Sequence, residues 1–201
     1  MRHPLCTVLA LSSAALFAQS AVKPLPAPQK DGGMPLMQVL QNRKSNRDFN
    51  IGFMLSEQHL SNLLWAANGF NRDKMRTAPS AMNAQAIDIY VVSEEAIWLF
   101  EPEKHALTKV KDGDFRKATG RQPFVANASV NLVYVYDLKK APGGNVRWGA
   151  VDAAFCAENV YLYCAQAKLK TVVRGGWGDN LAEVLGLPQD KQVVLCQSIG
   201  G

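Results

Sequence analysis

Several motifs that would point to a specific chemistry are absent from this 201-residue sequence. It has no Cys-x-x-Cys pair, no G-x-G-x-x-G block after a first strand and no G-x-x-x-x-G-K-[ST] loop. A thioredoxin-like redox motif, a Rossmann dinucleotide site and a P-loop are therefore unsupported. No Lys/Arg run exceeds two residues, so the net charge of +5 does not form the basic stripe of a nucleic-acid-binding protein.

Histidine and cysteine are also scarce. His59 and His105 lie in different segments, without the spacing of metal ligands, so we predict no metal site. Cys156 and Cys164 are eight residues apart on a predicted helix, which separates them by about 12 Å and rules out a disulfide between them. We expect these two and Cys196 to be small residues of the hydrophobic core.

The first twenty residues have the pattern of a secretory signal peptide. A short basic start precedes an apolar stretch at 7–18, and the small residues Ala18 and Ser20 follow it. The stretch is too short to span a bilayer. We predict cleavage after Ser20 and a secreted or periplasmic protein without a membrane anchor. The alternative is a cytosolic protein that begins with an apolar strand.

The rest of the chain divides into a short linker and one domain. Residues 21–33 hold three prolines and a Gly-Gly pair, which predicts an extended linker. Residues 34–201 have the length of a single domain. The sequence is 48% hydrophobic and 19% charged, enough apolar material to form a core.

Hydrophobic periodicity predicts an α+β fold. Short helices are expected at 35–43 and from the N-cap Ser56 to Gly69. A long helix at 150–170 is apolar on most sides, which indicates burial in the centre of the fold or in a subunit interface. Asn180 and Glu183 have the spacing of a capping box for one more short helix.

Six strands are predicted from runs of β-branched and aromatic residues. Residues 96–100 and 106–110 are expected to pair as a hairpin, and 130–136 to be a central strand. The predicted strands are 87–92, 96–100, 106–110, 130–136, 171–173 and 192–198.

The segment Arg43-Lys44-Ser45-Asn46-Arg47 gathers three cations and a hydroxyl. In an extended segment alternate residues face the same side, so Arg43, Ser45 and Arg47 can converge on one phosphate. A second interpretation is that Arg43 and Lys44 only complement the dipole at the end of the preceding helix. That interpretation does not account for Ser45 and Arg47.

Two other segments suit the polar edge of a heterocycle. Pro79, Ser80 and Asn83 combine free backbone N–H groups at a helix start with a side-chain amide, although the same residues also suit a simple turn. Gly175 and Gly176, in the loop 174–178, either let the chain turn or let the backbone approach a flat ring closely.

The order and spacing of these segments resemble the nitroreductase-like flavoproteins. That family has an R-x-S-x-R-x-F block, here at 43–49, then a Ser-initiated helix with Leu-Leu-x-Ala-Ala, here at 56–67. A P-S-x-x-N block follows, here at 79–83, and Gly-Leu-Pro at 186–188 precedes the last strand. The resemblance covers about residues 34–201 and is greatest to short secreted members, near the branch of azoline-oxidising dehydrogenases.

The resemblance implies a nitroreductase-like fold, with a central antiparallel or mixed sheet flanked by helices, in an intertwined homodimer. It also implies FMN as cofactor. Arg43 and Ser45 would hold the phosphate, and Arg47 would face the N1/O2 edge of the ring. Gly175 and Gly176 would approach the N5/O4 side, and the 79–83 block would come from the partner subunit. The expected cofactor-binding residues are Arg43, Lys44, Ser45, Arg47, Pro79, Ser80, Asn83, Gly175 and Gly176.

The function implied is an FMN-dependent oxidoreductase that transfers electrons to a small nitro, quinone or similar substrate by a ping-pong mechanism. No catalytic residue is assigned, because the flavin carries the redox chemistry. The electron donor is NAD(P)H or another reductant, and an exported protein would not meet cytosolic NAD(P)H. The alternatives are a secreted flavin-binding protein without turnover and a scaffold that no longer binds flavin.

Overall fold

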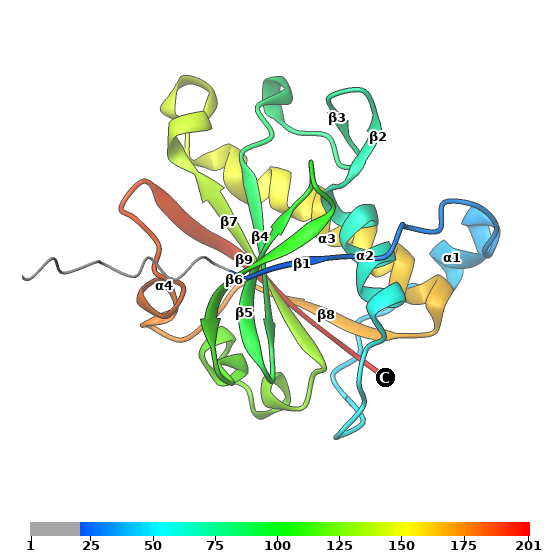
Figure 1. Ribbon diagram of the computed structural model, residues 1–201. Helices are drawn as coiled ribbons and strands as arrows, with labels where there is room; N and C mark the ends of the chain where they lie inside the picture. Colours follow the sequence, from blue (N-terminus) through cyan, green and yellow to red (C-terminus); the bar gives the residue numbers. More distant parts are fainter. Residues whose placement is uncertain (1–20) are drawn as a thin grey trace, which may run out of the picture.

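The structure, a computed structural model, describes residues 21–201. The predicted signal peptide, residues 1–20, lies outside the described residues. A large twisted sheet runs through the centre, with helices packed against it (Figure 1). Within the described part of the chain, none of the helices is long and apolar enough to cross a membrane.

The central sheet has seven strands in the order β1-β6-β5-β4-β7-β9-β8. Each neighbouring pair is antiparallel, so the antiparallel form of the expected sheet is confirmed. Its strands are β1 (Val22–Pro24), β4 (Ile87–Ser93), β5 (Ala96–Glu101), β6 (Ala106–Asp112), β7 (Val130–Asp137), β8 (Lys170–Arg174) and β9 (Lys191–Gly200). A small separate sheet pairs β2 (Phe70–Arg72) with β3 (Met75–Arg76).

The α-helices are α1 (Leu36–Asn42), α2 (Glu57–Asn68), α3 (Arg147–Ala167) and α4 (Leu181–Val184). Short 3₁₀ helices occupy the connections: η1 (Ala81–Asn83), η2 (Arg116–Thr119), η3 (Pro123–Ala126), η4 (Leu138–Lys140) and η5 (Pro142–Gly144). Helix α3 is the longest and lies along the sheet, with α2 beside it (Figure 1).

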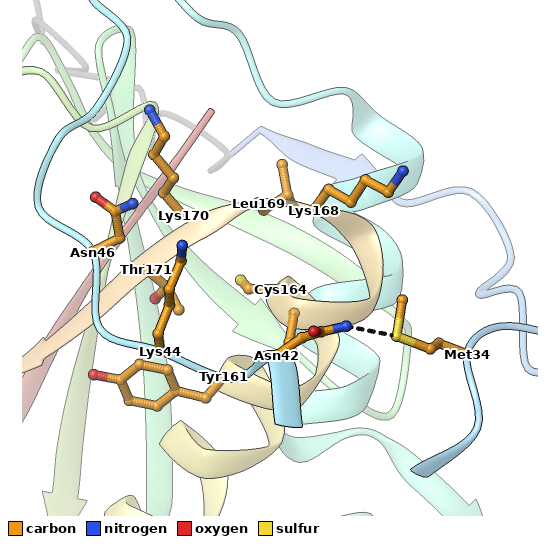
Figure 2. Close-up of a pocket in the computed structure, with 11 residues that line it drawn as sticks. Met34, Asn42, Lys44, Asn46, Tyr161, Cys164, Lys168, Leu169, Lys170 and Thr171 are labelled. Carbon is orange, nitrogen blue, oxygen red and sulfur yellow. Dashed lines mark hydrogen bonds between the residues drawn. The ribbon is translucent and has the colours of Figure 1, made fainter. Parts of the chain in front are cut away.

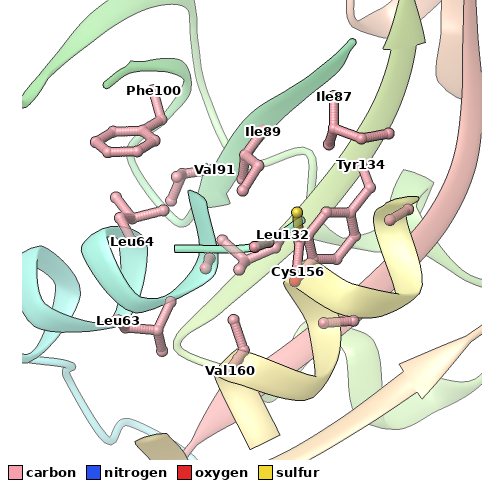
Figure 3. Packing of buried hydrophobic residues seen from close by; sticks show 14 of the residues in the cluster. Leu63, Leu64, Ile87, Ile89, Val91, Phe100, Leu132, Tyr134, Cys156 and Val160 are labelled. Carbon is pink, nitrogen blue, oxygen red and sulfur yellow. The ribbon is translucent and has the colours of Figure 1, made fainter. Parts of the chain in front are cut away.

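The two faces of the sheet are covered separately, as the alternation of side chains along β7 shows. Leu132, Tyr134 and Tyr136 face α2 and α3, and Val133 and Val135 face the opposite side. All eight residues of β7 are buried, which confirms the expected central strand. Figure 3 shows Leu63 and Leu64 of α2 and Cys156 and Val160 of α3 packed against β4 and β7. The opposite face packs against Leu181 and Leu185, in and just after α4.

The predicted strands and both early helices are confirmed with shifts of a few residues. Ser56 caps α2, since its side chain accepts a hydrogen bond from the His59 N–H at 3.2 Å. Cys156, Cys164 and Cys196 are free and buried, as expected of core residues.

The predicted end of the long helix at Lys170 was wrong. Helix α3 ends at Ala167, because Lys168 adopts the left-handed conformation with φ of 57°, and Lys170 already belongs to β8. The predicted capping box was also wrong. Asn180 has φ and ψ of −96° and 11°, rather than the extended backbone of an N-cap, and makes no side-chain cap.

Residues 21–33 are extended, as predicted, but they are not a free linker. Strand β1 extends the sheet by pairing with β6, and Leu25 is buried. Ser61 and Gln58 of α2 donate side-chain hydrogen bonds to the carbonyls of Pro26 and Ala27. The packed domain therefore starts before Met34. Proline is compatible with this arrangement because an edge strand leaves one row of N–H positions unpaired.

Candidate functional site

The hydroxyl of Tyr161, on α3, links the predicted cationic segment to β8. It lies 2.8 Å from the Ser45 hydroxyl and accepts a hydrogen bond from the Val173 N–H at 2.9 Å. The guanidinium of Arg43 lies over the Tyr161 ring, 5.2 Å from its centroid. The segment runs beside β8 because the Asn46 N–H donates to the Thr171 carbonyl at 2.9 Å. The structure thus brings Arg43 and Ser45 together.

The positive charges of this segment have no carboxylate partners. Within residues 21–201, Arg43, Lys44 and Arg47 form no ion pair. Arg43 is half-buried, and Lys44 and Arg47 are exposed. The segment therefore offers cations to a ligand without first having to break an ion pair inside the protein.

Lys44 points to a different place from its neighbours. With Asn46 it lines a cavity of about 360 Å³ that Arg43, Ser45 and Arg47 do not line. This is the alternation expected of an extended segment. Figure 2 shows Lys44, Lys168 and Lys170 around this cavity, with Tyr161 at one side. Lys170 is engaged by the Asp48 carbonyl and by the Asn50 side chain at 3.2 Å.

Gly175 and Gly176 follow β8 directly and are exposed. A Cβ added to either residue would meet no atom within 4 Å. They stand two and three residues after Val173, which is bonded to Tyr161. The open stretch of backbone thus begins two residues after Val173, which shares the Tyr161 hydroxyl with Ser45.

The Pro79–Asn83 block lies elsewhere in the chain's own fold. The Ala81 N–H donates to Asp152 Oδ1 at 3.0 Å, and Asp152 lies nine residues before Tyr161 on α3. That separation is about 13 Å along the helix axis. Within one chain, the structure does not bring the 79–83 block together with Arg43 and Ser45.

The backbone of this block is strained. Met82, Asn83 and Gln85 all have positive φ, at 50°, 54° and 50°. The Ser80 hydroxyl accepts the Gln85 N–H at 3.0 Å, and the Asn83 side chain accepts from the Gln85 amide at 3.1 Å. Met82 is 88% exposed. Such strain is frequent where a loop must present particular groups to a ligand.

Asp152 anchors this loop from a buried position, 1% exposed. Burial raises the pKa of its carboxyl, and the hydrogen bond from Ala81 opposes that change. Its second oxygen, Oδ2, has no partner among the described residues. A carboxylate in this environment is rare, because a buried charge normally has a paired cation.

Sequence reasoning missed Tyr161, Asp152 and the side chain of Arg174. Asp152 and Tyr161 both lie in the predicted long helix, and an acidic residue in such an apolar helix was the available signal. Nothing local marks Tyr161, whose partner Ser45 is 116 residues away.

The donors present fit a flat, phosphorylated cofactor such as FMN. Arg43 and Ser45 provide a cation and a hydroxyl for a phosphate, and the backbone at Gly175 and Gly176 is not obstructed by neighbouring atoms. Within residues 21–201, no three His, Cys, Asp or Glu side chains gather as metal ligands.

Comparisons with known proteins bear on the fold and the family of the chain. A family model described as "Nitroreductase family" matches residues 40–201. A putative nitroreductase from Ralstonia eutropha JMP134 is 40% identical, with a TM-score of 0.83, over 89% of this chain and 88% of that one. No curated protein sequence matches the chain.

More distant structures share the fold. A putative nitroreductase from Desulfovibrio desulfuricans, solved in complex with FMN, is 19% identical with a TM-score of 0.63, over 84% of this chain and 87% of that one. A chain of the Escherichia coli microcin synthetase McbBCD complex is 18% identical with a TM-score of 0.67, over 98% of this chain and 84% of that one.

Proposed function

The chain belongs to the nitroreductase family, and from this premise we propose that it is an FMN-dependent oxidoreductase. It passes electrons from a donor to a small organic substrate, such as a nitro compound or a quinone, by a ping-pong mechanism. One observation carries the proposal. The Tyr161 hydroxyl bonds both Ser45 and Val173, and so holds the cationic segment beside the open Gly175–Gly176 backbone.

The residues of this arrangement have separate roles in the proposal. Arg43 and Ser45 hold the phosphate of FMN, because a guanidinium and a hydroxyl supply charge-assisted donors to it. Arg47 supplies a cation to the polar edge of the ring. Gly175 and Gly176 let the backbone approach the ring, since neither has a side chain in the way. Lys44 lines the neighbouring cavity, and its role in the proposal is to add positive charge near the phosphate.

FMN, when bound, supplies the redox chemistry in both half-reactions. The chain's own residues bind and orient it and adjust its electrostatic environment. No protein acid or base is assigned to the reaction. Tyr161 keeps the Ser45 hydroxyl in place through the hydrogen bond between the two hydroxyls, and its bond to the Val173 N–H fixes its own position.

A homodimer is part of the proposal. The 79–83 block lies away from Arg43 and Ser45 within one chain, so a complete site needs that block from a second subunit. Exposed apolar side chains on α1 and α3 suit such an interface: Leu36 is 62%, Met37 74% and Phe155 46% exposed. Light scattering of the FMN-loaded protein should give twice the 22.0 kDa chain mass, less any cleaved N-terminus, and a monomer mass would contradict the dimer.

Export is a further part of the proposal and is motivated by the sequence of residues 1–20. N-terminal sequencing of protein from cell fractions should recover a chain that begins near Ala21 outside the cytoplasm. An intact Met1 in the cytoplasm would overturn it. In the exported case the physiological electron donor is a reductant other than cytosolic NAD(P)H.

The central experiment is a spectroscopic titration of the purified protein with FMN and with riboflavin. FMN should bind much more tightly, because only FMN has the phosphate that Arg43 and Ser45 recognise. Steady-state assays with NAD(P)H or a dye as donor, and a nitroaromatic or a quinone as acceptor, should then show turnover. Binding without turnover from any donor would leave a flavin-binding protein, and no binding at all would overturn the proposal.

A further inference from the structure

The side chain of Arg174 stands out because it is a buried cation at the end of an edge strand. Arg174 is 5% exposed and is the last residue of β8. Its neighbour Val173 packs with the core beneath α3, so Arg174 points to the other side of the strand. The next residues are Gly175 and Gly176, the open stretch of backbone described above.

All partners of the Arg174 guanidinium are neutral acceptors. Nη1 donates to the Thr119 carbonyl at 2.5 Å, and Nη2 donates to Asn131 Oδ1 at 3.2 Å. Longer contacts of 3.5 Å reach Gly176 O and Thr119 Oγ1, and Nε has no partner among residues 21–201. No carboxylate in the described chain forms an ion pair with Arg174.

These contacts hold the loop 175–178 at both ends against the same short helix. At its start, Arg174 donates to Thr119 of η2, and at its end the Gly178 N–H donates to the Ala118 carbonyl at 3.0 Å. The packing around the guanidinium is close, since a Cβ added to Gly120 would lie 2.2 Å from Nη1. The anchors leave Gly175 and Gly176 exposed between them.

A buried cation without a counter-charge is unfavourable, because neutral acceptors do not replace its lost hydration completely. Burial lowers the pKa of Arg174, although an arginine remains protonated at neutral pH. A negative charge in front of the loop would offset this cost. Under the proposed function, FMN becomes negatively charged there when it takes up two electrons and one proton.

We propose that Arg174 is a positioning residue that fixes the loop 175–178 at the flavin and that its uncompensated charge favours reduced over oxidised FMN. This inference rests on the proposed function, and it assigns Arg174 two separable properties. The N–H donors of the guanidinium hold the loop, and its positive charge adjusts the reduction potential of the flavin. Arg174→Lys keeps the charge and loses the guanidinium geometry, and Arg174→Gln loses the charge as well.

The first measurement is hydrogen exchange, in the protein without flavin, of the Gly178 N–H, the loop amide that donates to the Ala118 carbonyl. Exchange should be faster than wild type in both variants, because neither lysine nor glutamine bonds Thr119 and Asn131 at the same time in the geometry of the guanidinium. Exchange that is unchanged in both variants would overturn the positioning role. Urea denaturation of each variant establishes that it folds.

The second measurement is a redox titration of bound FMN with dithionite in the presence of a reference dye. Arg174→Gln should weaken reduced FMN about tenfold relative to oxidised FMN, which lowers the potential of this two-electron couple by about 30 mV. Arg174→Lys should stay near wild type. Equal shifts in both variants would show that the loop alone sets the potential, and an unchanged Gln variant would likewise overturn the electrostatic role.

Arg116→Gln is the matched control. Arg116 lies in η2, the short helix that Arg174 contacts, but its charge is compensated by Asp114 Oδ2 at 2.8 Å, so its loss should leave the potential unchanged. Failure of the proposed function is recognised separately. If wild-type protein binds no FMN, that function and the electrostatic role are both wrong, and hydrogen exchange still decides the positioning role.

Discussion

The segment 43–47 and Arg174 both carry positive charge without a carboxylate partner in the described chain, and the two are arranged in opposite ways. The cations of the segment 43–47 stand at the surface, and no carboxylate pairs with them in the described chain. Arg174 is 5% exposed and its donors are directed at Thr119 and Asn131. The exposed group is available to contact an anion directly. The buried group acts on a ligand only at a distance and through the loop that it holds.

The difference matters because the two groups lose their hydration at different steps, the exposed cations on ligand binding and the buried cation on folding. An exposed cation is hydrated until a ligand arrives, so it contributes little to folding and much to binding. A buried cation loses its hydration when the protein folds, and its neutral acceptors rely on its N–H groups for hydrogen bonds. Mutations in the two regions should therefore separate ligand affinity from stability.

The largest expected effect is on ligand affinity in the exposed region. Arg43→Ala should weaken FMN binding by about 2–5 kcal/mol, the usual cost of removing one member of a charge pair, here one that the bound ligand buries. Riboflavin binding should change much less, since it has no phosphate. Arg72→Ala, at an exposed arginine of β2, is the control with the same change in net charge. Equal affinities of wild type and Arg43→Ala in a fluorescence titration would favour the helix-dipole interpretation of Arg43.

The second effect concerns stability without ligand. Arg174→Met should lower the free energy of unfolding by about 1–3 kcal/mol, because the buried Thr119 carbonyl loses the donor Nη1 and Asn131 Oδ1 keeps only the Ser198 hydroxyl as donor. Arg47→Met, at an exposed position, should stay within about 0.5 kcal/mol of wild type. Urea denaturation of flavin-free protein measures both. Similar decreases in the free energy of unfolding of the two variants would show that the buried and exposed arginines contribute alike to stability.

The third comparison uses two glycines, Gly120 packed against the Arg174 guanidinium and Gly175 in the open backbone proposed to face the ring. Gly120→Ala should cost about 1–3 kcal/mol of stability, because the new Cβ would lie 2.2 Å from Arg174 Nη1. Gly175→Ala meets open space and should leave the flavin-free protein as stable as wild type. It should nevertheless weaken FMN, since the methyl group occupies the space proposed for the ring. Thermal unfolding without FMN and titration with FMN test the two statements, and unchanged FMN affinity in Gly175→Ala would place the ring elsewhere.

The smallest effect tests a buried charge of opposite sign. Burial raises the folded-state pKa of Asp152 above its ordinary 3.8, so its carboxyl favours folding when protonated. That contribution is complete below pH 3.8 and is lost as the pH rises through the raised pKa. Asp152→Asn keeps an acceptor for Ala81 and cannot ionise, so its stability relative to wild type should be greater at pH 7 than at pH 4. An equal difference at both pH values in urea denaturation would contradict this.

Much of the fold was predictable because local patterns report local backbone. The alternating and β-branched residues of 130–136 predicted β7, and Ser56 predicted the start of α2 by supplying a hydrogen bond three residues ahead. The end of α3 was mispredicted because Lys168 has no local feature that announces a left-handed cap. Asn180 likewise had the right spacing for a cap but the wrong backbone angles.

The candidate site was predictable in part for the same reason. Period-two alternation separated Arg43 and Ser45 from Lys44, and the structure places Lys44 alone of these three on the neighbouring cavity. The docking of residues 21–33 was not predictable, because its partners on β6 and α2 are distant in the sequence. Proline-rich composition looks the same in a free linker and in an edge strand.

The sequence by itself determined where most helices and strands lie, which strand is central, and the family blocks at 43–49 and 79–83. Each of these depends on residues within a few positions of one another. Only the tertiary structure decided that Tyr161 holds Ser45 from 116 residues away and that Arg174 is buried against Thr119, 55 residues away. The physical reason is that the environment of a polar side chain is set by what packs around it, and in this fold the packing partners come from distant parts of the chain.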